Sequence, residues 1–276
     1  TQDAGGGIHI RGGRSSEVAY LVDGVSVTDA YDGAIAVNIE NANIQELQVI
    51  SGTFNAEYGK AMSGIVNIVT KDGSDKFESY LQVYSGDHQS DDNIYKNLDS
   101  YTLTNDKNIT LNLSGPIIKK KLNFFISARS YASDGWLNGL QTFTMYGDTV
   151  HIDKNLNGYF DSTDVKKEPY YRAMNWRDKY SLQTKLTYKL NPKLILRLNS
   201  IISDEQWQNY NHYRQMTQEG QKTNYARGNF TGIKLSQSFS SKTFYDININ
   251  QSVHEYNAYL YKEYLDPRYI TPDHLF

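Results

Sequence analysis

The segment YSLQTKLTYKL, residues 180–190, decides the fold class because its side chains alternate between apolar and polar. A period of two residues is typical of a β-strand with one apolar and one polar face. The segment therefore predicts a strand whose two faces meet different environments. Its apolar positions are Tyr180, Leu182, Leu186, Tyr188 and Leu190.

Six further segments repeat this alternation, so the sequence predicts seven strands between residue 77 and residue 254. The segments are FESYLQVY (77–84), NITLNLSG (108–115), LNFFISARSY (122–131), KLILRLNSII (193–202), NFTGIKLSQSF (229–239) and TFYDININQSVH (243–254).

The connections between these strands alternate strictly between short and long. Three are short and polar: PIIKKK, Asn191-Pro192 and Ser240-Ser241-Lys242. The other three are long and span residues 85–107, 132–179 and 203–228. An antiparallel sheet with tight turns at one edge and long loops at the other is typical of an outer-membrane β-barrel.

Two architectures are compatible with the alternation itself. In a soluble β-sandwich the apolar face packs on a core and the polar face meets water. In a membrane barrel the apolar face meets lipid and the polar face lines a wet lumen. The loop asymmetry, the strand length and the aromatic residues near strand ends favour the barrel.

Composition excludes several other classes. The 276 residues carry 28 basic and 31 acidic side chains, so no broad basic surface for nucleic acid is expected. Cysteine is absent, which removes thiol catalysis and disulfides. No nucleophile or phosphate-binding motif occurs, so we expect no enzyme. The start, TQDAGGGIHI, has no signal peptide, and we expect a fragment or a processed form.

Residues 1–73 differ in composition from residues 74–276, because they contain many glycines and short aliphatic runs. IHIRGGRSSEVAYLVDGVSVTD (8–29) and IQELQVISGTFNAEYGKAMSGIVNIVTKDG (44–73) resemble the plug domain of TonB-dependent outer-membrane receptors. The motif residues that carry the resemblance are Arg11, Gly12, Gly13, Asp23, Gly24, Tyr58 and Gly59. The sequence FNAEYG (54–59) most resembles that of the receptor branch common in Bacteroidetes-type bacteria, which includes SusC-like and Oar-like receptors.

This resemblance implies a mainly β protein: a transmembrane antiparallel barrel of about 22 strands with a small mixed α/β plug in its lumen. Residues 1–73 would be the carboxy-terminal part of the plug, and residues 74–276 the first seven strands with their loops. Arg11 and Arg14 would pair with acidic groups on the lumen wall, and Glu57 with basic ones. Long loops would be extracellular and short turns periplasmic.

The implied function is energised uptake of a nutrient such as a glycan, a peptide or a chelate. Its partners would be a TonB-type protein that binds a segment not in this chain, outer-membrane lipid, an extracellular ligand and a surface lipoprotein lid. Two alternatives remain open. One is a plugged barrel that serves as a surface scaffold without transport, and the other is a soluble secreted β-sandwich.

DKNLNGYFDSTD, residues 153–164 within the long connection 132–179, has the residue pattern of a calcium-binding loop. Oxygen ligands stand at the spacing that such loops use, and Gly158 permits the sharp turn. We expect Ca²⁺ to order this loop, with an affinity of about 10⁻⁴–10⁻³ M. The alternative is a polar surface loop with an Asn-Gly turn. The predicted ligands are Asp153, Asn155, Asn157, Tyr159, Asp161 and Asp164.

Overall fold

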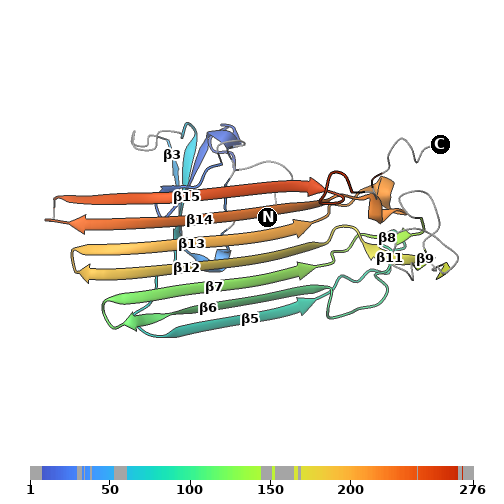
Figure 1. Ribbon diagram of the computed structural model, residues 1–276, viewed down its shortest axis with the longest axis horizontal. Coiled ribbons are helices and arrows are strands. Elements are labelled where there is room, and N and C mark those ends of the chain that lie inside the picture. Colours follow the sequence, from blue (N-terminus) through green and yellow to red (C-terminus); the bar gives the residue numbers. More distant parts are fainter. Residues whose placement is uncertain are drawn as a thin grey trace.

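The computed structural model of the chain describes residues 8–29, 33, 35–37, 39–52, 61–143, 151–152, 165–166, 169–240, 242–266 and 269. These residues form a four-stranded sheet of order β2-β1-β4-β3 and a seven-stranded sheet of order β15-β14-β13-β12-β7-β6-β5 (Figure 1). The mainly β architecture predicted from the sequence is confirmed. In the described part of the chain, no helix is long and apolar enough to cross a membrane.

The four-stranded sheet is built from the amino-terminal residues. Its elements are η1 (Ser15–Glu17), β1 (Val18–Val22), β2 (Val25–Ser26), η2 (Asn41–Asn43), β3 (Ile44–Ser51) and β4 (Gly64–Thr70). β1 runs parallel to β4, and every residue of β1 is buried. A strand buried on both faces has an uninterrupted apolar run, which explains why VAYLV does not alternate.

Asp23 and Gly24 make the turn between β1 and β2. Both have positive φ, 52° and 82°, and Val22 pairs directly with Val25. A two-residue hairpin turn with positive φ at both positions favours Asp-Gly, because glycine has no Cβ to clash and aspartate tolerates this region. The motif Leu-Val-Asp-Gly-Val is therefore a hairpin signal.

The seven-stranded sheet is an antiparallel meander in which each strand pairs with the next of the seven along the chain. The strands are β5 (Glu78–Gly86), β6 (Asp106–Ile118), β7 (Leu122–Ser133), β12 (Arg177–Asn191), β13 (Leu194–Trp207), β14 (Thr223–Ser238) and β15 (Phe244–Tyr259). The sheet is open in the described residues, with β5 and β15 at its edges.

Several strands extend beyond the alternating segments. β14 begins at Thr223 rather than 229, and β13 ends at Trp207 rather than 202. The backbone ladder continues through these residues, and Trp207 pairs with Asn224. Both faces are largely polar there, so hydropathy carries no alternation although the strands continue.

In its described residues the long connection between β7 and β12 has two short antiparallel ladders of its own. The expectation that Ca²⁺ orders residues 153–164 stays a prediction, because those residues lie outside the described part of the chain. β8 (Asn138–Gln141) pairs with β11 (Tyr170–Ala173), and β9 (His151–Ile152) pairs with β10 (Val165–Lys166). The connection also contacts the one after β13, which contains η3 (His212–Arg214) and η4 (Gln218–Gly220). Gln218 donates its backbone N–H to Oε1 of the fully buried Gln141 at 2.9 Å.

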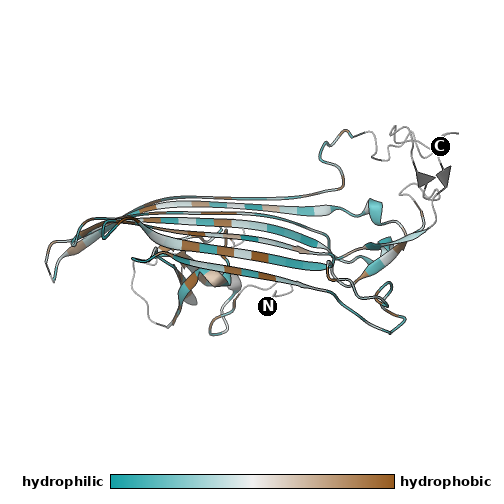
Figure 2. Ribbon diagram, turned by 90° about the horizontal axis from the view of Figure 1, so that it is seen from below, coloured by the Kyte–Doolittle hydropathy of each residue, from teal (hydrophilic) through white to brown (hydrophobic). Residues whose placement is uncertain are grey.

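The amino-terminal sheet lies against one face of the seven-stranded sheet, here called the inner face (Figure 2). Burial along β12 is the reverse of that in a soluble protein. The inner-facing Gln183, Lys185 and Thr187 are only 2–4% exposed, whereas Leu182 and Leu186 on the outer face are 40% and 37% exposed. A soluble β-sandwich would bury the apolar face, so the described residues do not form the sandwich that the sequence leaves open as an alternative.

Candidate functional site

An apolar contact anchors the amino-terminal sheet to the inner face. Ile201 of β13 and Phe230 of β14, 2% and 1% exposed, join the core that contains Val27 and Val37. Gly228 favours this close approach, because a Cβ there would lie 2.8 Å from Ser203 Oγ and 3.3 Å from the carbonyl oxygen of Ala36. The inner face is thus polar along most of its length, with an apolar patch where the amino-terminal unit packs.

Glu40, just before η2, is the first of two buried ionic contacts. Its Oε1 accepts from Lys179 Nζ at 2.8 Å and from Ser181 Oγ at 3.1 Å, and its Oε2 contacts Arg129 Nη1. Arg129 is held in turn by Asn108, whose Oδ1 accepts from Nε at 2.6 Å. Burial acts to raise the pKa of Glu40, but the hydrogen bonds and charges of Lys179 and Arg129 outweigh it and lower the pKa.

This lowered pKa of Glu40 predicts that the contact between the amino-terminal unit and the inner face is insensitive to mild acid. A carboxylate with a depressed native pKa stabilises at pH values above its ordinary pKa, and the stabilisation is lost as pH falls through the native value. We expect the protection factors of the β1 and β4 amides in the full-length protein, which are corrected for the pH dependence of intrinsic exchange, to be steady from neutral pH down to about pH 5 and to fall only below about pH 4. Protection factors that already fall at pH 6, in wild type but not in Glu40→Gln, would contradict this assignment.

Lys185 of β12 centres the second ionic contact and is 3% exposed. Its Nζ lies 3.2 Å from Asp23 Oδ2 and 2.8 Å from Asp72 Oδ1, and it donates to the carbonyl oxygen and Oγ1 of Thr70, both at 3.1 Å. Asn199 of β13 donates to Asp23 Oδ2 at 2.9 Å. The Asp23 of the hairpin turn thus binds two strands of the seven-stranded sheet.

Two smaller contacts extend the seam between the amino-terminal unit and the inner face. Asn123 of β7 donates to the carbonyl oxygen of Gly73 at 3.3 Å and to Asp75 Oδ1 at 2.9 Å. At the opposite edge, His254 Nδ1 of β15 lies 3.0 Å from Asp29 Oδ2. Together these contacts tie the amino-terminal unit to strands across the sheet, from β7 to β15.

Residues 1–66 match the family model described as TonB-dependent Receptor Plug Domain. The match supports a TonB-dependent receptor. We therefore call the amino-terminal unit the plug, and the inner face of the seven-stranded sheet the wall.

Curated relatives agree with this match. The chain is 27% identical over 215 residues to the TonB-dependent transporter Oar of Myxococcus xanthus, which covers 67% of this chain and 18% of that protein. It is 32% identical over 80 residues to the vitamin B12 transporter BtuB of Vibrio vulnificus (strain CMCP6), which covers 29% of this chain and 13% of that protein. The chain thus spans less than a fifth of the length of either relative.

Solved structures share the fold. The siderophore receptor PirA from Pseudomonas aeruginosa superposes with a TM-score of 0.59 at 16% identity, covering 91% of this chain and 35% of that chain. The outer membrane transporter YddB from Escherichia coli gives 0.54 at 11% identity, covering 84% and 30%. At these identities the likeness concerns the arrangement of plug and strands alone.

The structure describes five of the seven predicted plug motif residues. Asp23 and Gly24 reach the wall through the hairpin turn, as described above. Arg11 and Gly12 have positive φ, and the guanidinium of Arg11 lies over Gly52 of the plug itself. Gly13 packs against Ser63. The remaining motif residues, Tyr58 and Gly59, lie outside the described residues, as do Glu57 and all six predicted calcium ligands.

Gly13 offers a test of the motif. A Cβ at Gly13 would lie 2.3 Å from Ser63 Cβ, which forces the two segments apart. Gly13→Ala should destabilise the plug by about 1–3 kcal/mol, the usual cost of overpacking. The matched control is Gly86→Ala, because a Cβ at Gly86 meets nothing within 4 Å. Hydrogen exchange of the plug amides, measured as the temperature is raised, should distinguish the two variants.

The charges of the seam differ in sign from most of those predicted. The sequence predicts plug arginines against wall acids, whereas the described contacts place plug carboxylates against wall cations. Within the described residues neither Arg11 nor Arg14 forms an ion pair with the seven strands, and such a pair elsewhere on the wall stays a prediction. Lys185 could have been found, because it stands on the polar face of an alternating strand. Glu40 sits in a loop without any pattern.

Aromatic residues gather at the end of the wall where the long connections lie. Trp207 and Tyr256 have ring centroids 6.2 Å apart, and the guanidinium of Arg177 lies 5.5 Å from the Trp207 ring. Arg177 also pairs with Glu205 at 3.0 Å. The register places these side chains on the same face as the plug. They are candidate contacts for a ligand that enters from this end.

Proposed function

We propose that the chain is the plug-and-wall part of a TonB-dependent outer-membrane transporter that takes up a nutrient. The plug would close the lumen at rest and yield when a TonB-type protein pulls on a segment outside these residues. Removing the plug contacts from Glu40 and Lys185 would expose the polar face as a path for the cargo. The reversed burial along the strands is the observation that carries this proposal.

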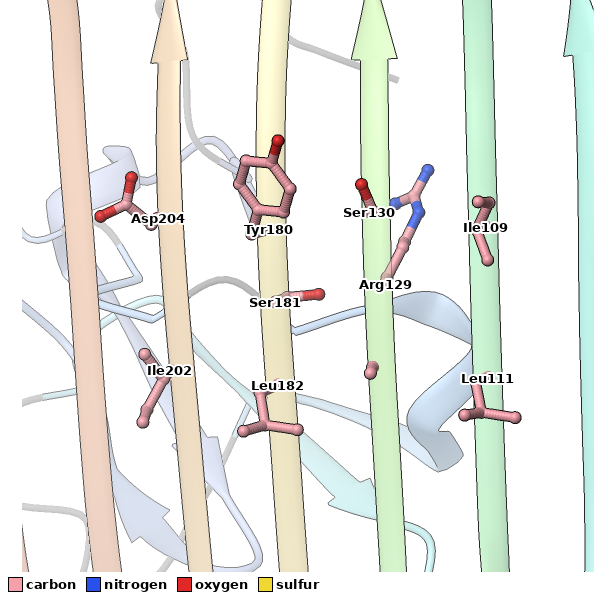
Figure 3. A pocket seen from close by; sticks show the side chains of 10 residues that line it. Ile109, Leu111, Arg129, Ser130, Tyr180, Ser181, Leu182, Ile202 and Asp204 are labelled. Carbon is pink, nitrogen blue, oxygen red and sulfur yellow. The ribbon is translucent and has the colours of Figure 1, made fainter.

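The outer face fits a lipid environment. Figure 3 shows Ile109, Leu111, Tyr180, Leu182 and Ile202 on the outer side of β6, β12 and β13, with the plug behind the strands. These side chains line a hollow of about 530 Å³ over the small residues of β7. An apolar outer face that covers a polar, plugged interior is what an outer-membrane barrel needs.

The proposal includes an orientation and further partners. Long connections would be extracellular and short turns periplasmic, as in bacterial outer-membrane barrels. A membership in the SusC-like or Oar-like branch would add a surface lipoprotein lid over the long connections. The similarity to Oar supports the Oar-like side of this proposal, and the cargo could be a glycan, a peptide or a chelate.

Calcium binding by residues 153–164 is a further part of the proposal. The ladder of β9 and β10 pairs Ile152 with Val165, so the two ends of this segment are held together. Closed ends lower the entropy cost of gathering ligands around an ion. In the described residues no cluster of three or more His, Asp or Glu side chains forms another metal site.

The calcium proposal predicts protection that depends on the ion. Asp153→Ala together with Asp161→Ala should make the connection between β7 and β12 sensitive to protease, because two of its carboxylates are lost. The control is Asp91→Ala with Asp92→Ala in the preceding long connection. If a chelator leaves cleavage of the wild-type connection unchanged, residues 153–164 are a polar loop without a metal.

Solute depletion tests the transport proposal. Cells that carry the full-length protein, cells that lack it and cells that lack the TonB-type protein are grown in one complex medium. Transport predicts at least one solute that only the first strain depletes. If the three strains deplete the same solutes while the protein resides in the outer membrane, the protein is a surface scaffold instead. Recovery of the protein in the aqueous fraction without detergent would reject both.

A further inference from the structure

The charges at the seam are segregated between plug and wall. In every described ion pair between β7, β12 or β13 and the plug or its linker, the cation belongs to the wall and the carboxylate to the plug or linker. The carboxylates are Glu40, Asp23, Asp72 and Asp75. The wall cations are Arg129, Lys179, Lys185, Lys189 and Arg197.

The wall itself holds few carboxylates that could replace those of the plug. Glu205 already pairs with Arg177 at 3.0 Å, and Asp246 pairs with Lys234 at 3.1 Å. Asp106 accepts from Ser133. When the plug moves away, the central cations therefore lose the carboxylates that balance them at rest.

The outer face of the same strands has no such excess. The register places Lys107 and Arg227 there, together with Asp178, Asp204 and Glu255. Arg227 pairs with Asp204 at 2.9 Å. The surplus of cations is thus confined to the face that the plug covers, so it does not reflect composition in general.

A cleft leads along this surplus between plug and wall. It has a volume of about 330 Å³ and lies beside Lys185, Arg197 and Lys234 on the wall and Asp23 and Asp72 on the plug. A cleft lined by one sign of charge on one side attracts solutes of the opposite sign. The carboxylates of Asp23 and Asp72 mark where anionic groups fit.

We propose that the cargo is a polyanion, a solute with several carboxylate or phosphate groups, which takes over the wall cations as the plug carboxylates leave them. This inference rests on the transport function proposed above. Exchange of one set of anions for another keeps Lys185 and its neighbours paired throughout passage, whereas a neutral cargo would leave these cations to water and small counterions alone. The plug carboxylates thus occupy the positions of the cargo's anionic groups.

Ion selectivity of the unplugged pore tests this inference. The full-length protein is placed in planar bilayers, the plug is displaced with urea, and the reversal potential is measured under a KCl gradient. Lys185→Gln with Arg197→Gln should lower the chloride-to-potassium permeability ratio by up to about tenfold at low ionic strength. The matched control, Lys107→Gln with Arg227→Gln, removes two positive charges from the outer face and should leave the permeability ratio unchanged. Equal ratios in both variants would overturn the inference.

The identity of the cargo gives a second, independent outcome. Citrate added on the side of the long connections should reduce the chloride current of wild type more than that of Lys185→Gln with Arg197→Gln. In the depletion assay, a TonB-dependent solute that is neutral or cationic would overturn the polyanion inference while the transport function stands. A polyanionic solute in that assay would support both.

Discussion

Lys185→Met should detach the plug from the wall more than any other change considered above. Methionine keeps the volume of the lysine stem but removes the ammonium group that contacts Asp23, Asp72 and Thr70. Removing one partner of a buried ionic network costs several kcal/mol, because the remaining charges stay desolvated and unpaired. Asp72 is 40% exposed, so we place the loss near the low end, about 3 kcal/mol.

A loss of that size corresponds to about a hundredfold increase in the population of detached plug. Backbone hydrogen exchange of β1 and β4 in the full-length protein reports this population directly. Lys107→Met is the matched control, because Lys107 is exposed on the outer face of β6. Similar hydrogen exchange in the two variants would show that Lys185 does not help to hold the plug against the wall.

Glu40→Gln should have the second largest effect, about 2–3 kcal/mol. Glutamine retains the shape of the side chain, but it has one acceptor oxygen in place of two, and Arg129 and Lys179 lose the charge that balances them. Both cations are largely covered, with side chains 23% and 12% exposed. Glu46→Gln is the control, since Glu46 stands exposed on the edge strand β3 of the same plug.

A double-mutant cycle separates the ionic contact from other effects of the substitution. Adding Lys179→Met to Glu40→Gln should restore part of the lost stability, because the unbalanced cation is then removed as well. Groups in direct contact typically show coupling energies of about 0.5–3 kcal/mol. Strictly additive losses would mean that Glu40 and Lys179 do not interact in solution, despite their separation of 2.8 Å.

The sequence predicts the architecture because each local signal agrees with the final packing. Alternation in residues 180–190 predicts the strand, and Asp23-Gly24 predicts the hairpin, since both depend only on neighbouring residues. Strand ends such as Thr223 escape prediction because both faces are polar there. Alternation by itself does not separate a sandwich from a barrel, because it shows that the two faces differ but not which one is covered by protein. The loop asymmetry and the plug motif are the signals that favour the barrel.

The ionic seam was largely outside the reach of sequence reasoning. Glu40 and Lys179 are 139 positions apart along the chain, and nothing in either neighbourhood indicates the other. The sequence predicts wall contacts from Arg11, Arg14 and Glu57, but the guanidinium of Arg11 lies over Gly52, and Glu57 lies outside the described residues. A count of charges on the polar positions of the alternating strands would have indicated cations on the inner face. It would not have indicated which plug residues balance them.

The short stretch between β4 and β5 limits how the plug can travel. Thr70 ends the plug sheet and Glu78 begins the first wall strand, and Gly73 runs so close to Phe124 that a Cβ would lie 2.5 Å from its carbonyl oxygen. Fully extended, this stretch reaches about 25 Å. The carboxyl end of the plug is therefore tethered to the first wall strand, so the opening proposed above would be a rotation about this end and not a complete exit of the plug.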